Sequence, residues 1–149
     1  MGILVLDSYR FEAIRPLFDK HMEVVKEGED ADRAFNWYRS ILDNDDVFCY
    51  VIEIEGRPIA YCIFTFVESY KGLYANILQI YTEEKRIGRK LFEIVKTVSE
   101  KAGCFSIGGT TLFPDIFLKR WFPEGSPIPK QAGTYVYMDL PNDIQNLNG

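Results

Sequence analysis

A short segment near the middle of the chain joins a glycine to several cationic side chains. Residues 83–90 read EEKRIGRK, directly after an apolar run that includes Ile80 and Tyr81. Apolar residues at helical spacing begin within the segment, which therefore contains the predicted start of a helix. Backbone N–H groups at a helix N-terminus bind phosphate, glycine lets a ligand approach the backbone, and arginine and lysine add charge-assisted contacts. The chemistry expected here is the binding of a phosphate-bearing ligand.

Other reactive residue types form no comparable constellation. Cys49, Cys62 and Cys104 lie in apolar runs at unequal spacing, and His21 is the only histidine. This pattern favours buried free thiols in a reducing compartment over a zinc site, so no metal is expected. His21 has no Ser or Cys close in sequence, which argues against a nucleophilic triad. The run GGTT at 108–111 lacks the lysine and spacing of a phosphate loop and is interpreted as a turn.

Composition limits the class of protein. The chain has 149 residues, 47% of them hydrophobic, which predicts a single domain over residues 1–140 with a flexible tail at 141–149. The formal net charge of -5 would repel a phosphate backbone, so nucleic acid is not an expected partner. No apolar run approaches the roughly 20 residues of a membrane span, and we expect a cytoplasmic protein. Nothing in the sequence indicates an oligomeric state.

The N-terminal half predicts one strand, two helices and a meander. An apolar stripe predicts a helix over about 10–26, with a kink at Pro16 or, alternatively, a start at Pro16. The expected elements are a strand at 3–6, helices at 10–26 and 34–42, and antiparallel strands at 47–55, 59–67 and 73–81.

The C-terminal half predicts a crossover back to the sheet. A helix with Ile87, Leu91 and Val95 on its apolar face ends at Gly103, and a short strand follows at 104–107. A strand, helix, strand unit normally makes a right-handed parallel crossover. The remaining expectations are an aromatic helix at 113–122, a loop at 123–133 and a last strand at 134–140. The fold class is therefore α/β (α+β), with a mixed, mostly antiparallel central sheet flanked by helices.

The order of these elements and the junction around residue 83 resemble the GCN5-related N-acetyltransferases (GNAT superfamily). The family pattern at this junction is Arg or Gln, two variable residues, Gly, one variable residue, then Gly or Ala. Gly88 matches its last position, whereas Arg86 stands at the first glycine and Glu83 at the leading Arg or Gln. The resemblance implies acetyl-CoA as cosubstrate, bound by residues on the strand and the helix start: Ile80, Tyr81, Arg86, Ile87, Gly88, Arg89 and Lys90.

The resemblance implies transfer of an acetyl group to an amine of a small molecule or protein. Backbone N–H near Ile80 or Tyr81 would hold the thioester oxygen, and Trp121 stands about where the family has a proton-donating Tyr. The strand at 73–81 offers no carboxylate, so a base would act through water or come from Glu53 or Glu68. The alternative is a catalytically inactive protein of the same fold that serves as a binding or structural component. Arg86 at a loop glycine position and the missing Tyr are what this alternative predicts, and Glu83 and Glu84 would bring negative charge toward an anionic ligand.

Overall fold

The computed structural model describes residues 1–110, 130–132 and 135–141 of the chain. Within these residues, seven strands form one sheet in the order β1-β2-β3-β4-β5-β7-β6. Only β4 and β5 run parallel, and every other described pair is antiparallel. The predicted mixed, mostly antiparallel sheet is confirmed. Its strands are β1 (Gly2–Leu6), β2 (Val47–Ile54), β3 (Arg57–Ser69), β4 (Gly72–Thr82), β5 (Ser106–Thr110), β6 (Lys130–Ala132) and β7 (Tyr135–Asp139).

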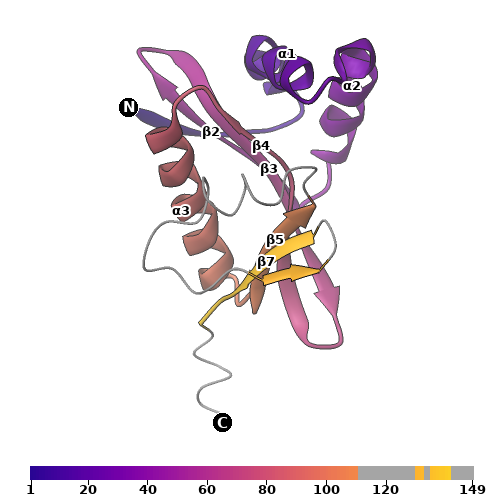
Figure 1. Ribbon diagram of the computed structural model, residues 1–149, viewed down its shortest axis with the longest axis vertical. Coiled ribbons are helices and arrows are strands. Elements are labelled where there is room, and N and C mark those ends of the chain that lie inside the picture. Colours follow the sequence, from indigo (N-terminus) through magenta and orange to yellow (C-terminus); the bar gives the residue numbers. More distant parts are fainter. Residues whose placement is uncertain (111–129, 133–134, 142–149) are drawn as a thin grey trace.

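Helices cover both faces of the sheet. Figure 1 shows α1 and α2 together on one face and α3 on the other. None of the helices in the described ranges is long and apolar enough to cross a membrane. Their bounds are α1 (Arg15–Val24), α2 (Ala31–Ile41) and α3 (Lys85–Lys101), with 3-10 turns η1 (Phe11–Ile14) and η2 (Gly28–Asp30) before α1 and α2.

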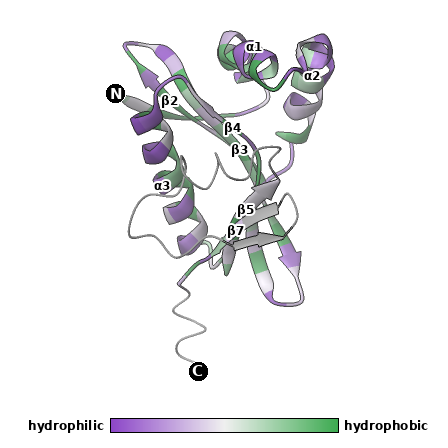
Figure 2. Cartoon of the chain, viewed as in Figure 1, coloured by the Kyte–Doolittle hydropathy of each residue, from purple (hydrophilic) through white to green (hydrophobic). Residues whose placement is uncertain are grey.

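The alternation of side chains along β3 separates two apolar cores. Cys62 and Phe64 face α3 and belong to the core that includes Leu91 and Val95. Tyr61 and Ile63 face the opposite side, where a second core is built from α1, α2 and η1. Figure 2 shows hydrophobic residues on the inner side of α3 and hydrophilic ones on its outer side. The apolar side of α3 packs on the sheet, and the helix begins at Lys85, shortly after β4 ends at Thr82.

The first helix differs from its prediction. The structure divides residues 10–26 into η1 and then α1, which begins at Arg15 with Pro16 in its first turn. Proline loses nothing there because the first N–H groups of a helix have no intrahelical partner. The predicted kink at Pro16 is therefore wrong, and the alternative start at Pro16 was one residue late. Lys26, with a φ of 61°, ends the helix, and Glu27 N–H donates to the Met22 carbonyl.

Two glycines predicted as a turn lie inside a strand. Gly108 and Gly109 belong to β5, which pairs with β4 on one side and β7 on the other. The expected strand at 104–107 therefore begins later and ends at Thr110. Only glycine fits at position 109, because a Cβ there would lie 2.8 Å from the Ile77 carbonyl oxygen. The predicted loop at 123–133 is wrong over residues 130–132, because these residues form β6 and pair with β7.

The other elements agree with their predictions in type and order. The meander of β2, β3 and β4 is confirmed, although β3 and β4 extend further into their shared turn than expected. Gly103, with a φ of 87°, ends the α3 segment as predicted. The aromatic helix expected at 113–122, most of the following loop and the tail beyond residue 141 lie outside the described residues.

Candidate functional site

β4 pairs with β5 along only part of its length. Their parallel register runs from Ala75 opposite Ile107 to Ile77 opposite Gly109. β4 then continues to Thr82, and no described residue pairs with this second half on the β5 side. Its backbone N–H and C=O groups on that side are hydrogen-bonding groups without a described partner. An extended ligand can therefore pair with β4 between Leu78 and Thr82.

A β-bulge in β4 begins where this pairing ends. Ile63 of β3 lies opposite Gln79 and Phe64 lies opposite Ile77, so Leu78 is the extra residue. Leu78 packs against the core of α1 and α2, and Gln79 hydrogen-bonds to side chains of the same layer. Because of the bulge, the consecutive residues Leu78 and Gln79 both face the layer of α1 and α2.

The turn between β4 and α3 is fixed by one hydroxyl. Thr82 is buried, and its Oγ1 accepts a hydrogen bond from Glu84 N–H at 3.0 Å and contacts the Glu84 carbonyl oxygen at 2.7 Å. Glu83 N–H donates to the carbonyl of Ile59 in β3 at 3.0 Å. These bonds hold the chain at its exit from the sheet and set the direction in which α3 begins.

The first turn of α3 presents backbone donors without a described partner and several cationic side chains, directly after the exposed N-cap residue Glu84. The N–H groups of Lys85, Arg86 and Ile87 have no partner among the described residues, whereas Gly88 N–H donates to the Glu84 carbonyl. Lys85, Arg86 and Lys90 are exposed, and the first turn contains no acidic residue. Cations at a helix N-terminus oppose the helix dipole, so this arrangement is unfavourable unless an anion binds there.

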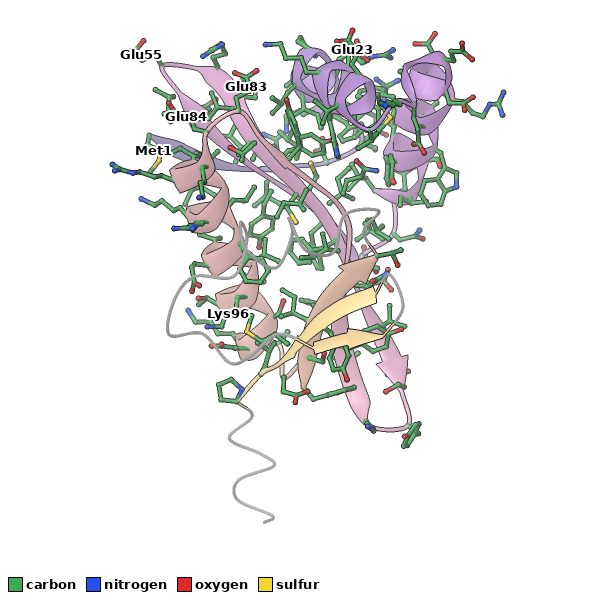
Figure 3. The ribbon with its side chains drawn as sticks, viewed as in Figure 1. Met1, Glu23, Glu55, Glu83, Glu84 and Lys96 are labelled. Atoms are coloured by element: carbon green, nitrogen blue, oxygen red, sulfur yellow. The ribbon has the colours of Figure 1, made fainter. Side chains whose placement is uncertain are left out.

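The carboxylate of Glu83 forms ion pairs with residues outside α3. Its carboxylate lies 2.8 Å from Lys20 Nζ of α1 and 3.8 Å from Arg57 Nη1 of β3. Figure 3 shows Glu83 at the end of the sheet beneath α1, with Glu84 at the start of α3. The charge of Glu83 is therefore partly neutralised by residues from two other elements, whereas Glu84 remains exposed at the N-cap of α3.

A polar network that no sequence pattern predicted lies next to the second half of β4. His21 Nδ1 lies 2.5 Å from the Tyr61 hydroxyl, which also contacts Gln79 Oε1 at 3.3 Å. Gln79 Nε2 donates to the Tyr38 hydroxyl at 2.9 Å. The His21 ring stacks on Tyr81 with centroids 4.8 Å apart. The only available signal was the position of His21 on the apolar stripe of the first helix.

Burial sets the protonation of this network. Desolvation lowers the pKa of His21 from 6.5 to about 4, so the imidazole is neutral at physiological pH. Desolvation also raises the pKa of the Tyr61 hydroxyl well above its usual value, which keeps its proton in place. Burial likewise raises the pKa values of Cys49 and Cys62, so these free thiols are poor nucleophiles.

The structure brings most predicted site residues to one end of the sheet. Ile80 faces the α3 core, Tyr81 faces α1, and Arg86, Ile87, Gly88, Arg89 and Lys90 form the first turns of α3. The two predicted carboxylate bases are not on β4: Glu68 is near the β3–β4 turn at the other end of the sheet, and Glu53 is on β2, opposite Gly2 of β1. Trp121 lies outside the described residues. No group of three or more metal-ligating side chains occurs in the described ranges.

A hollow on the surface lies at the other end of β4, away from this site. It has a volume of about 500 Å³, and its lining includes Tyr70, Tyr74, Phe105 and Asp139. These residues lie near the β3–β4 turn, at the end of β4 remote from Thr82. None of the predicted site residues lines it.

Several solved structures that superpose on this chain are described as acetyltransferases. The PaiA N-acetyltransferase of Thermoplasma acidophilum, in complex with coenzyme A, superposes with a TM-score of 0.65 at 13% identity, covering 94% of this chain and 100% of its own. A GCN5-related N-acetyltransferase from Ralstonia eutropha gives 0.64 at 16% identity, covering 89% and 99%. A protein from Clostridium acetobutylicum described as a predicted acetyltransferase, solved with acetyl-CoA, gives 0.62 at 14% identity, covering 88% and 95%. No protein-family model and no curated protein matches the chain. The chain therefore has the GNAT fold.

Proposed function

We propose that this protein is an N-acetyltransferase that takes its acetyl group from acetyl-CoA. One observation carries the proposal: the half of β4 that no described residue pairs with on the β5 side leads directly to Lys85, Arg86 and Ile87, whose N–H groups have no partner among the described residues. An extended thioester chain can pair with the strand while the attached phosphates reach the helix terminus. The fold shared with acetyltransferases, among them structures with coenzyme A and acetyl-CoA, supports the same arrangement.

Each part of the proposed cofactor site has a distinct role. The N–H groups of residues 85–87 hold the pyrophosphate, and the exposed cations Arg86 and Lys90 add charge. Arg89 and Ile87 complete the first turns, and Gly88 keeps the buried side of the helix narrow. Backbone N–H at Ile80 or Tyr81 would stabilise the oxyanion that develops on the thioester.

The acceptor in this proposal is an amine of a small molecule or protein. The net charge of -5 favours a cationic acceptor, because an acidic surface attracts amines in their protonated form. The buried free thiols fit a reducing compartment, and we place the protein in the cytoplasm.

Calorimetric titration of the protein with acetyl-CoA tests the cofactor site. We expect saturable binding, and a ligand at about 100 times its dissociation constant stabilises the folded protein by roughly 2.7 kcal/mol. Arg86→Glu combined with Lys90→Glu should abolish binding. Lys96→Glu combined with Lys101→Glu, further along α3, is the control with the same change of net charge and should bind normally.

Two negative results have different meanings. Absence of binding and of thermal stabilisation at millimolar acetyl-CoA would refute the proposed function. Tight binding without acetyl transfer to any of a broad panel of amines would instead favour the inactive protein of the same fold. Glu83 and Arg86, which depart from the family pattern, are the residues that favour this second candidate.

A further inference from the structure

The single histidine of the chain lies beside the proposed reaction site without a role in binding acetyl-CoA. His21 projects from α1 and is buried, with 8% of its surface exposed. It lies against Tyr61 of β3 and Tyr81 of β4. Tyr81 pairs with β3 and belongs to the part of β4 that no described residue pairs with on the β5 side. The adjacent residue, Lys20, reaches Glu83 at the start of the β4–α3 turn. His21 is therefore held over the same strand that would carry the thioester.

The hydrogen bonds of the network define which ring nitrogen carries the proton. Gln79 donates through Nε2 to Tyr38, which leaves its Oε1 to accept the Tyr61 hydroxyl proton. With its one proton donated to Gln79, the Tyr61 oxygen accepts from His21, and we assign the proton of the neutral imidazole to Nδ1 on this basis. In neutral imidazole Nε2 is then an acceptor with a free lone pair.

Nε2 of His21 is not fully enclosed although the ring is buried. Every fully buried side-chain nitrogen or oxygen in the described ranges has a hydrogen-bond partner. The described residues provide a partner for Nδ1 only, so Nε2 is not fully enclosed. A buried ring with one fixed nitrogen and one accessible acceptor nitrogen is the arrangement of a histidine that interacts with a ligand.

We infer that His21 Nε2 accepts the proton of the acceptor amine during acetyl transfer. This inference rests on the proposed function and names a base where the sequence offered only Glu53 and Glu68. The amine nitrogen bonds to the thioester carbon and transfers its proton to Nε2. The carbon–sulfur bond breaks with its electron pair on sulfur, and the imidazolium returns the proton to the thiolate or to water.

Neighbouring side chains support this role without touching the reacting atoms. Tyr61 and Gln79 are positioning residues, because they fix the tautomer and orientation of the imidazole through hydrogen bonds. Tyr38 anchors Gln79 from α2. Burial keeps the imidazole unprotonated, so it is available as an acceptor at physiological pH. The imidazolium that forms is a strong acid in this environment and releases its proton readily.

One substitution of His21 and one of Tyr61 separate the roles of the two ring nitrogens. In His21→Asn the amide nitrogen can replace Nδ1 as donor to Tyr61, but nothing replaces Nε2. We expect kcat with acetyl-CoA and simple primary amines, such as ethylamine and an alanyl peptide, to fall roughly 100- to 10,000-fold. Calorimetry should give wild-type affinity for acetyl-CoA. Tyr61→Phe should lower kcat less, with an unchanged KM for acetyl-CoA, because it removes only the positioning bond.

Nitrogen NMR of the single histidine gives an assay that does not depend on turnover. In the acetyl-CoA complex we expect the tautomer with a proton on Nδ1, and addition of the same amines should shift the Nε2 resonance. The opposite tautomer, an unchanged Nε2 resonance at saturating amine, or wild-type kcat in a folded His21→Asn variant would each overturn the inference. If acetyl-CoA does not bind at all, the proposed function fails first. If acetyl-CoA binds but the Nε2 resonance does not change on addition of amine, only the inferred role of His21 is overturned.

Discussion

Lys20 Nζ of α1 lies 2.8 Å from Glu83 Oε1 at the end of β4. The pair connects a helix on one face of the sheet to the turn that begins α3 on the other. We predict that Lys20→Met weakens acetyl-CoA binding by roughly two- to ten-fold at low salt, because it leaves the charge of Glu83 less compensated near the phosphate site. Glu83→Gln should strengthen binding by a similar factor.

The double variant Lys20→Met with Glu83→Gln should bind with nearly wild-type affinity, because it restores the original net charge at this position. Titration calorimetry at two salt concentrations measures the effect, which should shrink as salt rises. Arg33→Met, an exposed residue of α2, is the control for loss of one positive charge. Equal weakening in Arg33→Met would show that the effect is one of overall charge.

Arg86 should have opposite effects on stability and on binding. Its charge lies in the first turn of α3, where it opposes the helix dipole. We predict that Arg86→Gln raises the free energy of unfolding of the ligand-free protein by about 0.3–1 kcal/mol. The same variant should bind acetyl-CoA more weakly and with a smaller salt dependence. Urea denaturation and calorimetry measure the two quantities.

Lys101→Gln provides the comparison for Arg86, since it removes a charge from the last turn of the same helix, where the dipole favours a cation. It should lower stability slightly and leave binding unchanged. A loss of stability in Arg86→Gln would contradict the view that the cations at this terminus serve ligand binding.

The order of elements was predictable because hydrophobic periodicity distinguishes strands from helices over long segments. The apolar stripe of residues 87–95 predicted α3, and the β-branched runs predicted the meander. The bulge at Leu78 could not be predicted from the sequence, since β4 contains several pairs of adjacent apolar residues besides Ile77 and Leu78. Gly109 was misassigned because glycine is typical of turns, and only the proximity of Ile77 explains it within a strand.

Much of the candidate site depends on contacts between residues far apart in sequence. His21 meets Tyr61 across 40 positions, and Lys20 meets Glu83 across 63. No local spacing encodes such pairs, so the sequence alone made Glu83 seem an obstacle to anion binding. The helix start was different: a glycine and several cations after an apolar strand are contiguous, which is why that part of the site could be predicted.

Gly109 should be essential to the geometry where β4 and β5 stop pairing. A Cβ added to it would lie 2.8 Å from the backbone oxygen of Ile77, closer than real contacts allow. We predict that Gly109→Ala lowers the free energy of unfolding by about 1–3 kcal/mol, because the strands must move apart. Gly28→Ala is the control, since its Cβ would meet only the Glu23 side chain at 4.0 Å. Urea denaturation that ranks the two variants equally would contradict this explanation.

The protonation of His21 should be visible in the pH dependence of stability. Its pKa is about 4 in the folded protein against 6.5 for the free side chain, and burial is the cause. Between these values the unfolded chain holds a proton that the folded protein lacks. The contribution of His21 is therefore complete above pH 6.5 and is lost as the pH falls toward 4.

We predict that this contribution amounts to about 3 kcal/mol over the interval, from roughly 1.4 kcal/mol per unit of pKa difference. His21→Gln removes the titrating group, so the stability difference between wild type and variant should fall by this amount between pH 7 and pH 4. Carboxylates titrate in both proteins and cancel in the difference. Because His21 is the only histidine, its NMR titration gives the folded pKa directly. A folded pKa near 6.5, or a stability difference that is constant with pH, would show that the imidazole is solvated and would contradict its burial against Tyr61 and Tyr81.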